Sequence, residues 1–148
     1  MRALSQIAAR TGKQIDTDDV RDIVIWGNHS TTQYADTHFA KIGDASVRDI
    51  VGDAEWLDGE FITKVAKRGA EIISVMGKSS AASAAAAACE HMHDWWCGNQ
   101  NGGWVSMAVI NEGGAYGIDK DLCFSMPCNV SPDGEVSVVA DLTLNEFQ

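Results

Sequence analysis

Apolar residues recur every three or four positions over residues 56–76, which predicts a long amphipathic helix. The expected buried stripe of this helix consists of Leu57, Phe61, Val65, Gly69, Ile72, Ile73 and Met76. Gly77 should end it. A second helix is predicted over residues 81–96, for which Ser79 and Ser80 are suitable N-terminal caps.

The beginning of the chain shows a shorter helical pattern over residues 2–9, which ends at Gly12. The apolar run 23–26 then predicts a short buried strand. A glycine turn follows this strand and leads directly to His29, so we expect the imidazole at the end of a rigid support. The polar stretch 31–52 separates this turn from the long helix.

Branched and aromatic residues dominate three later segments, 104–110, 122–130 and 135–142, which predict an antiparallel sheet. Pro132-Asp133-Gly134 supplies a hairpin turn between the last two. Pro127 falls inside the middle segment, so we expect that position at a sheet edge or a bulge. The pattern predicts one α+β domain in which long helices pack on a twisted antiparallel sheet.

Composition and charge narrow the possible partners. The formal net charge of −10 repels nucleic acid and anionic lipid. The chain has four cysteines and no Cys-x-x-Cys pair, which favours a reducing compartment. Neither a signal peptide nor an apolar run long enough to cross a bilayer is evident. We therefore expect a soluble, cytoplasmic protein that binds neither nucleic acid nor membrane.

Several chemistries are disfavoured by spacing. Cys89, His93 and Cys97 share one helix face, but they are spread over about 12 Å of helix, too far for one zinc ion at about 2.3 Å from each ligand. We expect no metal site, and cysteines that are packed in the interior. The chain has no Gly-x-Ser-x-Gly elbow, Walker loop or Gly-x-Gly-x-x-Gly turn, so the motifs indicate neither a serine nucleophile nor a dinucleotide site.

The alanine-rich first half of the helix at 81–96 allows another backbone to approach closely. That composition predicts packing against other helices or against another subunit. Trp95, Trp96 and Trp104 are expected in the core or in an interface, because the negative charge disfavours a nucleic-acid stacking surface.

His29 and Arg2 are the candidates for chemistry. An imidazole can exchange a proton near neutral pH, and a planar guanidinium can form a two-point ion pair with a carboxylate. Together they would suit a hydroxy acid or a keto acid. Taken singly, His29 could be a hydrogen-bonded loop histidine and Arg2 a surface charge.

A series of motifs covers nearly the whole chain and carries a resemblance. The motifs are RALSQ at 2–6, IWGNHSTTQY at 25–34, GEFIT at 59–63, KRGA at 67–70, SSAASAA at 79–85, WVSM at 104–107, YGI at 116–118 and FSMP at 124–127. In this order they make the chain similar to the NAD-dependent malate dehydrogenases of the lactate/malate dehydrogenase family, the branch with cytosolic and many bacterial enzymes.

The resemblance implies that residues 1–148 are a C-terminal, substrate-binding domain, truncated at both ends. The Rossmann domain that binds NAD would lie upstream. His29 resembles the family's catalytic histidine, which exchanges the hydroxyl proton while hydride moves between substrate and nicotinamide. Arg2 resembles the arginine that binds the substrate carboxylate, and Ser79 and Ser80 match serines that line the same pocket.

The family's histidine-orienting aspartate falls upstream of Met1, so we expect the isolated chain to be inactive. The intact enzyme would interconvert malate and oxaloacetate with NAD as a homodimer. Two alternatives remain open. The substrate is lactate or another 2-hydroxy acid, or the chain is a non-catalytic module that associates through its alanine-rich helix.

Overall fold

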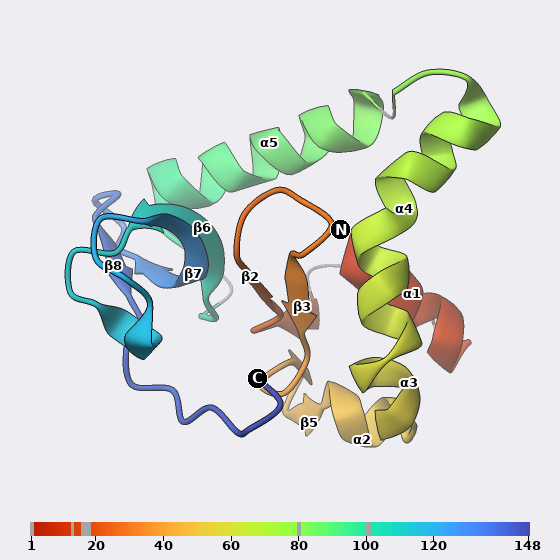
Figure 1. Ribbon diagram of the computed structural model, residues 1–148, viewed down its shortest axis with the longest axis horizontal. Coiled ribbons are helices and arrows are strands. Elements are labelled where there is room, and N and C mark those ends of the chain that lie inside the picture. The colour runs from red at the N-terminus through yellow and green to blue at the C-terminus, as the bar shows by residue number, and fades with distance from the viewer. Residues whose placement is uncertain (1, 13, 16–18, 80, 100–101) are drawn as a thin grey trace.

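The computed structural model describes residues 2–12, 14–15, 19–79, 81–99 and 102–148. Its helices lie around three small antiparallel sheets (Figure 1), as the α+β prediction requires. Along the chain the elements are α1 (Arg2–Thr11), β1 (Val20–Arg21), β2 (Val24–Trp26), β3 (Tyr34–Asp36), β4 (Lys41–Ile42), β5 (Ala45–Ser46), α2 (Val47–Val51), α3 (Ala54–Asp58), α4 (Glu60–Met76), α5 (Ala81–Cys97), β6 (Val105–Ile110), the 3₁₀ turn η2 (Ala115–Gly117), β7 (Cys123–Val130) and β8 (Val136–Val138).

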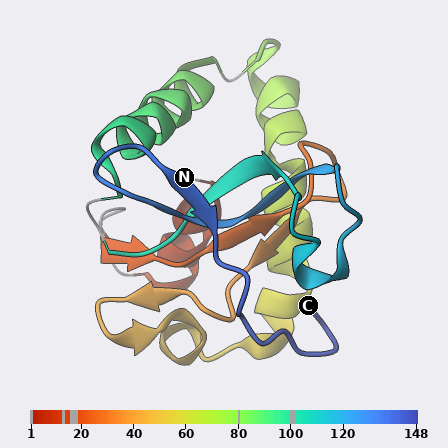
Figure 2. The ribbon, with the colours of Figure 1, turned by 90° about the vertical axis from the view of Figure 1, so that its left-hand side faces the viewer.

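The sheets have the strand orders β1-β4-β5, β2-β3 and β6-β7-β8. An isolated bridge between Gly27 and Ser125 joins the β2–β3 hairpin to β7, and the two sheets lie side by side in Figure 2. The predicted hairpin of β7 and β8 and its third strand β6 are confirmed. The strand expected at 23–26 is β2, and its hairpin partner β3 lies in the stretch for which the hydrophobic pattern gave no strand.

The expectation for Pro127 is wrong, because β7 is the central strand of its sheet. Pro127 pairs with Ser106 of β6, and its carbonyl accepts a hydrogen bond from the Val139 N–H at 2.9 Å. Proline has no N–H to return to the Val139 carbonyl, so β8 pairing stops there. The Tyr116 hydroxyl donates to that carbonyl instead, which explains how a central strand tolerates proline at this position.

The main hydrophobic core lies between the β2–β3 hairpin and helices α1, α3 and α4. Its buried members are Ala3, Ile7, Ala35, Ala40, Val47, Trp56, Leu57, Phe61 and Val65. The predicted N-terminal helix is therefore confirmed as α1, with its Ile7 side fixed against this core. A second cluster joins Val24 and Trp26 of the hairpin to Met126 of β7, so the hairpin is packed on both sides.

The single helix predicted over 56–76 is two helices, α3 and α4, which meet at Gly59. Asp53 caps α3 by accepting a hydrogen bond from the Trp56 N–H at 3.0 Å. Gly59 has φ −124° and ψ −93°, which ends one helix and starts the next. Hydrophobic periodicity runs through this break because both helices face the same core.

The predicted buried stripe is correct only in its first half. Phe61 and Val65 are 0% and 6% exposed, but Ile73 and Met76 at the far end of α4 are exposed. The far end extends beyond the elements that cover the first turns (Figure 1). The polar stretch 31–52 also holds more structure than its pattern indicated, namely β3, β4, β5 and α2.

Helix α5 confirms the predicted helix at 81–96 but not its burial, because none of its residues is buried. Cys89 is exposed and Cys97 is half-buried, so the expectation of buried cysteines is wrong for this helix. Trp95 and Trp96 are exposed, which excludes the core alternative for both. The part of the chain that the structure describes contains no helix that is both long and apolar enough to cross a membrane.

Candidate functional site

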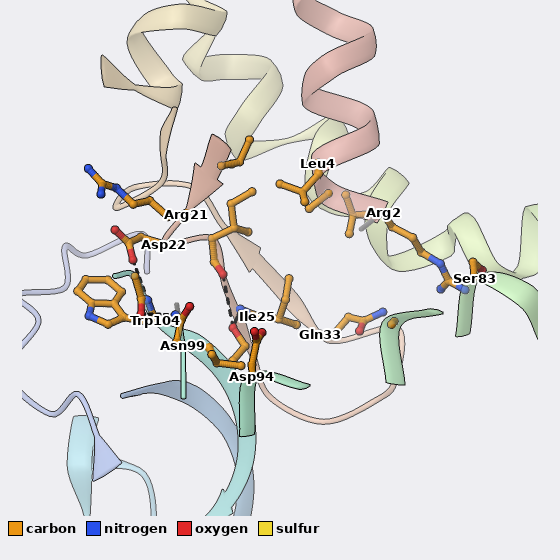
Figure 3. Close-up of a pocket in the computed structure, with 18 of the residues that line it drawn as sticks. Arg2, Leu4, Arg21, Asp22, Ile25, Gln33, Ser83, Asp94, Asn99 and Trp104 are labelled. Carbon is orange, nitrogen blue, oxygen red and sulfur yellow. Dashed lines mark hydrogen bonds between the residues drawn. The ribbon is translucent and has the colours of Figure 1, made fainter. Parts of the chain in front are cut away.

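A cavity of about 630 Å³ brings Arg2 and His29 together. It lies between the start of α1, the hairpin turn after β2, the inner face of α5 and the beginning of β6. Figure 3 shows side chains from these elements around the cavity. The residues that the sequence pattern paired for hydroxy-acid or keto-acid chemistry therefore line one space, although they are far apart in the chain.

His29 lies in the turn of the β2–β3 hairpin, which is held by polar groups on both sides of it. The Ser30 hydroxyl donates to Asn28 Oδ1 at 2.8 Å, and the Thr32 N–H donates to Ser30 Oγ at 3.1 Å. Gly27, at φ +98°, exchanges backbone hydrogen bonds with Ser125. These contacts fix the turn while the His29 side chain stays exposed at the cavity.

The buried carboxylate of Asp36 holds the two strands of the same hairpin together. Asp36, which is 0% exposed, accepts hydrogen bonds from the Trp26 indole N–H at 3.0 Å and the Gln148 side-chain amide at 2.7 Å. Its other oxygen accepts from the His38 backbone N–H at 2.9 Å and lies 2.8 Å from His38 Nδ1. A buried charge is tolerated when it is this fully hydrogen-bonded. Asp36 thus ties β3 to β2, the two strands that carry the His29 turn.

Arg2 enters the cavity from the first turn of α1, where Ala3 and Ile7 anchor the helix in the core. In Figure 3 its side chain extends toward Ser83 of α5. The other arginine that lines the cavity is Arg21. Its guanidinium donates to the Gly43 carbonyl at 3.0 Å, so it lies at the β4–β5 turn. Arg2 and Arg21 both line the cavity, and the Arg2 side chain is the one that extends toward α5 (Figure 3).

Asp22 and Trp104 close the other end of the cavity. Asp22 has the left-handed φ of +63°, which aspartate tolerates better than most residues. Its Oδ1 accepts the Trp104 N–H at 2.9 Å, so this carboxylate fixes the start of β6 (Figure 3). The carboxylate therefore has a structural partner, and we assign it no role in proton transfer.

Of the two predicted serines, the structure describes only Ser79. Ser79 is exposed, precedes α5 and does not line the cavity, and Ser80 lies outside the described residues. Ser83, one turn into α5, lines the cavity together with Ala84, Ala87 and Asp94. Helical periodicity could have identified this face, because these positions repeat at close to 3.6 residues per turn. The roles of Ser79 and Ser80 remain predictions.

The cavity thus combines the Arg2 guanidinium, the exposed His29 imidazole and hydroxyl groups with apolar side chains from α1 and β2, and Arg21, Asp22 and Asp94 line it as well. Such a set can bind a carboxylate and exchange a proton with a neighbouring oxygen. No group of three or more His, Cys, Asp or Glu side chains suited to a metal ion occurs in the described part of the chain.

Comparison with known proteins places this geometry in a family. The family model of the lactate/malate dehydrogenase alpha/beta C-terminal domain matches residues 1–148. The chain belongs to this family. It is 48% identical over 147 residues to the malate dehydrogenase of Corynebacterium efficiens, covering 99% of this chain and 43% of that protein. It is 45% identical over 150 residues to the cytoplasmic malate dehydrogenase of Zea mays, covering 99% of this chain and 44% of that protein.

Solved structures give the same result for the fold. The malate dehydrogenase of Naegleria fowleri matches with a TM-score of 0.86 and 44% identity, over 99% of this chain and 43% of that chain. The lactate dehydrogenase of Trichomonas vaginalis, solved with NADH and oxamate, matches with a TM-score of 0.84 and 36% identity, over 99% of this chain and 45% of that chain. The chain spans less than half the length of these relatives.

Proposed function

We propose that this chain is the substrate-binding domain of a malate dehydrogenase that interconverts malate and oxaloacetate with NAD. The observation that carries this proposal is the joint position of Arg2 and His29 in one cavity of a chain 48% identical to a malate dehydrogenase. Arg2 would form the two-point ion pair with a substrate carboxylate. That contact orients the substrate carbon that carries the reacting oxygen toward the hairpin turn.

His29 would exchange the proton on that oxygen. In oxaloacetate reduction the protonated imidazole donates a hydrogen bond to the ketone oxygen and then transfers its proton to it. In malate oxidation the neutral imidazole accepts the hydroxyl proton. The rigid turn between Gly27 and Ser30 would keep the ring at the cavity through both directions.

When bound, NAD⁺ would accept hydride in malate oxidation and NADH would supply it in oxaloacetate reduction. The described residues do not form a site for it by themselves, since all their strand pairs are antiparallel and the chain lacks a Gly-x-Gly-x-x-Gly turn. A partner domain would therefore hold the cofactor, which agrees with a relative solved with NADH that is more than twice as long as this chain. We propose a cytoplasmic location, because relatives at 44% and 45% identity are named cytoplasmic.

Helix α5 supports a proposal about assembly. It buries none of its residues in this chain, and Met92, Trp95 and Trp96 are exposed on it. Exposed apolar groups of this size favour contact with another surface. We propose that α5 contacts a second domain or subunit in the intact enzyme, which would be a homodimer. Size-exclusion chromatography of the 148-residue chain tests the alternative of a module that only self-associates.

The substrate can be tested in a fusion enzyme, defined as residues 1–148 joined to the nucleotide-binding half of the Corynebacterium efficiens malate dehydrogenase. We expect it to oxidise NADH with oxaloacetate and much more slowly with pyruvate, whereas the 148-residue chain alone should be inactive. The native Corynebacterium enzyme is the control. A preference for pyruvate would favour the lactate alternative, which the similarity to the Trichomonas enzyme supports. No turnover with either ketone would reject the proposal.

A further inference from the structure

Gly69 occupies a position in the interior of α4 where glycine is unfavourable. Glycine destabilises a helix interior relative to alanine because it loses more conformational freedom on folding. Gly69 is not among the residues with positive φ, so its backbone conformation is open to any residue. A glycine with ordinary helical backbone angles can serve the close approach of another group.

The group that approaches is the guanidinium of Arg2. A Cβ at position 69 would lie 3.0 Å from Nη1, 3.3 Å from Nη2 and 3.4 Å from Cζ of Arg2. These three atoms, all from one side-chain tip, are its nearest neighbours. The Arg2 guanidinium thus lies against bare α4 backbone, while Figure 3 shows the side chain extending toward Ser83 across the cavity.

From these contacts we infer that Gly69 is a positioning residue for Arg2, which sets where the guanidinium meets the substrate carboxylate. The inference rests on the function proposed above. A methyl group at position 69 would displace the guanidinium by a few tenths of an ångström, since contacts near 3.0 Å are too short for carbon. Two-point binding of a carboxylate depends on such placement.

A purely structural role for Gly69 makes a different prediction. If glycine served to let α1 and α4 cross closely, an added Cβ would meet backbone or core atoms and the fold would lose stability. Here the added Cβ meets the end of a flexible side chain. Alanine would therefore stabilise the helix, while the added methyl group would displace the Arg2 guanidinium. Stability and substrate affinity should therefore change in opposite directions.

The test compares Gly69→Ala with Ala70→Gly, an exposed position on the same helix. In the fusion enzyme we expect Gly69→Ala to keep or raise the Tm, to raise KM for oxaloacetate by about 3- to 10-fold, and to change kcat by less than about 2-fold. Ala70→Gly should lower the Tm and leave KM unchanged. In an Arg2→Lys background, Gly69→Ala should raise KM no further, because the guanidinium is gone.

Two results would overturn the inference. One is an unchanged KM in Gly69→Ala, and the other is a fall in Tm that accompanies the rise in KM. If the parent fusion enzyme has no oxaloacetate turnover, the proposed function fails instead, and the packing is judged on the 148-residue chain. There the Arg2 Nε–H signal in NMR should shift in Gly69→Ala and not in Ala70→Gly. An unshifted signal would reject the role of Gly69 as well.

Discussion

Helices α4 and α5 each have 17 residues, yet this chain covers them very differently. The first half of α4 is fixed by Phe61 and Val65, which lie in the main core with α1 and α3. No residue of α5 is buried. Its C-terminal end is held more closely, since the Trp95 indole donates to the Gly134 carbonyl at 3.2 Å and a Cβ at Gly98 would lie 2.8 Å from Pro132.

The two helices lie on different sides of the same cavity and are held in place differently. One side, here called the packed wall, is formed by α1 and α4 and is fixed by the main core, as is the β2–β3 hairpin. Arg2 and His29 therefore lie on elements that this chain stabilises itself. The alanines of α5 have high helix propensity and can form a helix with little tertiary support. Helix α5 can therefore form without a core, and its position depends on the contacts at its C-terminal end and on the domain or subunit that would cover it.

The largest effect on stability is expected at the centre of the packed wall. Phe61→Ala should lower the free energy of unfolding of the 148-residue chain by about 3–5 kcal/mol, because a fully buried ring leaves a cavity. Urea denaturation followed by circular dichroism measures this change. A loss below about 1 kcal/mol would show that this wall is not held by its core.

Replacing the Asp36 carboxylate by a neutral amide should have the next largest effect on the free energy of unfolding. In Asp36→Asn an amide group replaces one oxygen and faces hydrogen-bond donors, either those of Trp26 and Gln148 or the His38 backbone N–H. We expect a loss of about 2 kcal/mol in the same denaturation assay. The exposed Asp133→Asn is the matched control and should change stability by less than about 0.5 kcal/mol. Equal effects at the two positions would remove Asp36 as the support of the hairpin.

A smaller, pH-dependent effect is expected from the ion pair of Arg48 and Asp58. Its two hydrogen bonds measure 2.7 and 2.6 Å, and they hold the pKa of Asp58 below its ordinary value. The unfolded chain therefore binds this proton more readily, so the stabilisation is present above about pH 4 and is lost as pH falls through the folded pKa. Because both side chains are partly exposed, we expect about 1 kcal/mol at neutral pH between the parent and Asp58→Asn. A difference that persists unchanged at pH 2 would contradict this assignment.

The smallest effect is expected on α5. Trp96 is 83% exposed, so Trp96→Ala should change the free energy of unfolding of the 148-residue chain by less than about 0.5 kcal/mol. In the fusion enzyme, where α5 would be covered, the same substitution should lower the Tm by several degrees. A loss above 1 kcal/mol in the chain alone would mean that α5 is packed there, and the contrast with α4 would no longer hold.

The same contrast explains which helices and strands the sequence pattern predicts. Periodicity identified α1, most of α4 and α5, and β-branched runs identified β6, β7 and β8. The break at Gly59 was missed because the apolar period continues through it. The strands around residues 34–46 were missed because they are only two or three residues long and are set by pairing partners rather than by their own pattern.

Burial was less predictable than the elements themselves. The periodic residues Ile73 and Met76 were assigned to the core, but an apolar stripe does not reveal how far the covering elements extend. Arg2 and His29 were found from their chemistry and from the family resemblance. Ser83 and Asp94 were not, because periodicity places them on one face of α5 but does not show that this face lines a cavity. Gly69 is a glycine inside a helix, which periodicity alone assigns to the buried stripe, whereas the structure places the Arg2 guanidinium beside it.

The central claim is that the turn held by the packed wall carries the proton-transfer group. The most direct measurement is the rate of NADH oxidation by oxaloacetate in the fusion enzyme with His29→Asn, beside His93→Asn on the exposed face of α5 as control. We predict that kcat falls by about 10²- to 10⁴-fold in His29→Asn and remains at the parent value in His93→Asn. A kcat within a few-fold of the parent in His29→Asn would contradict the account.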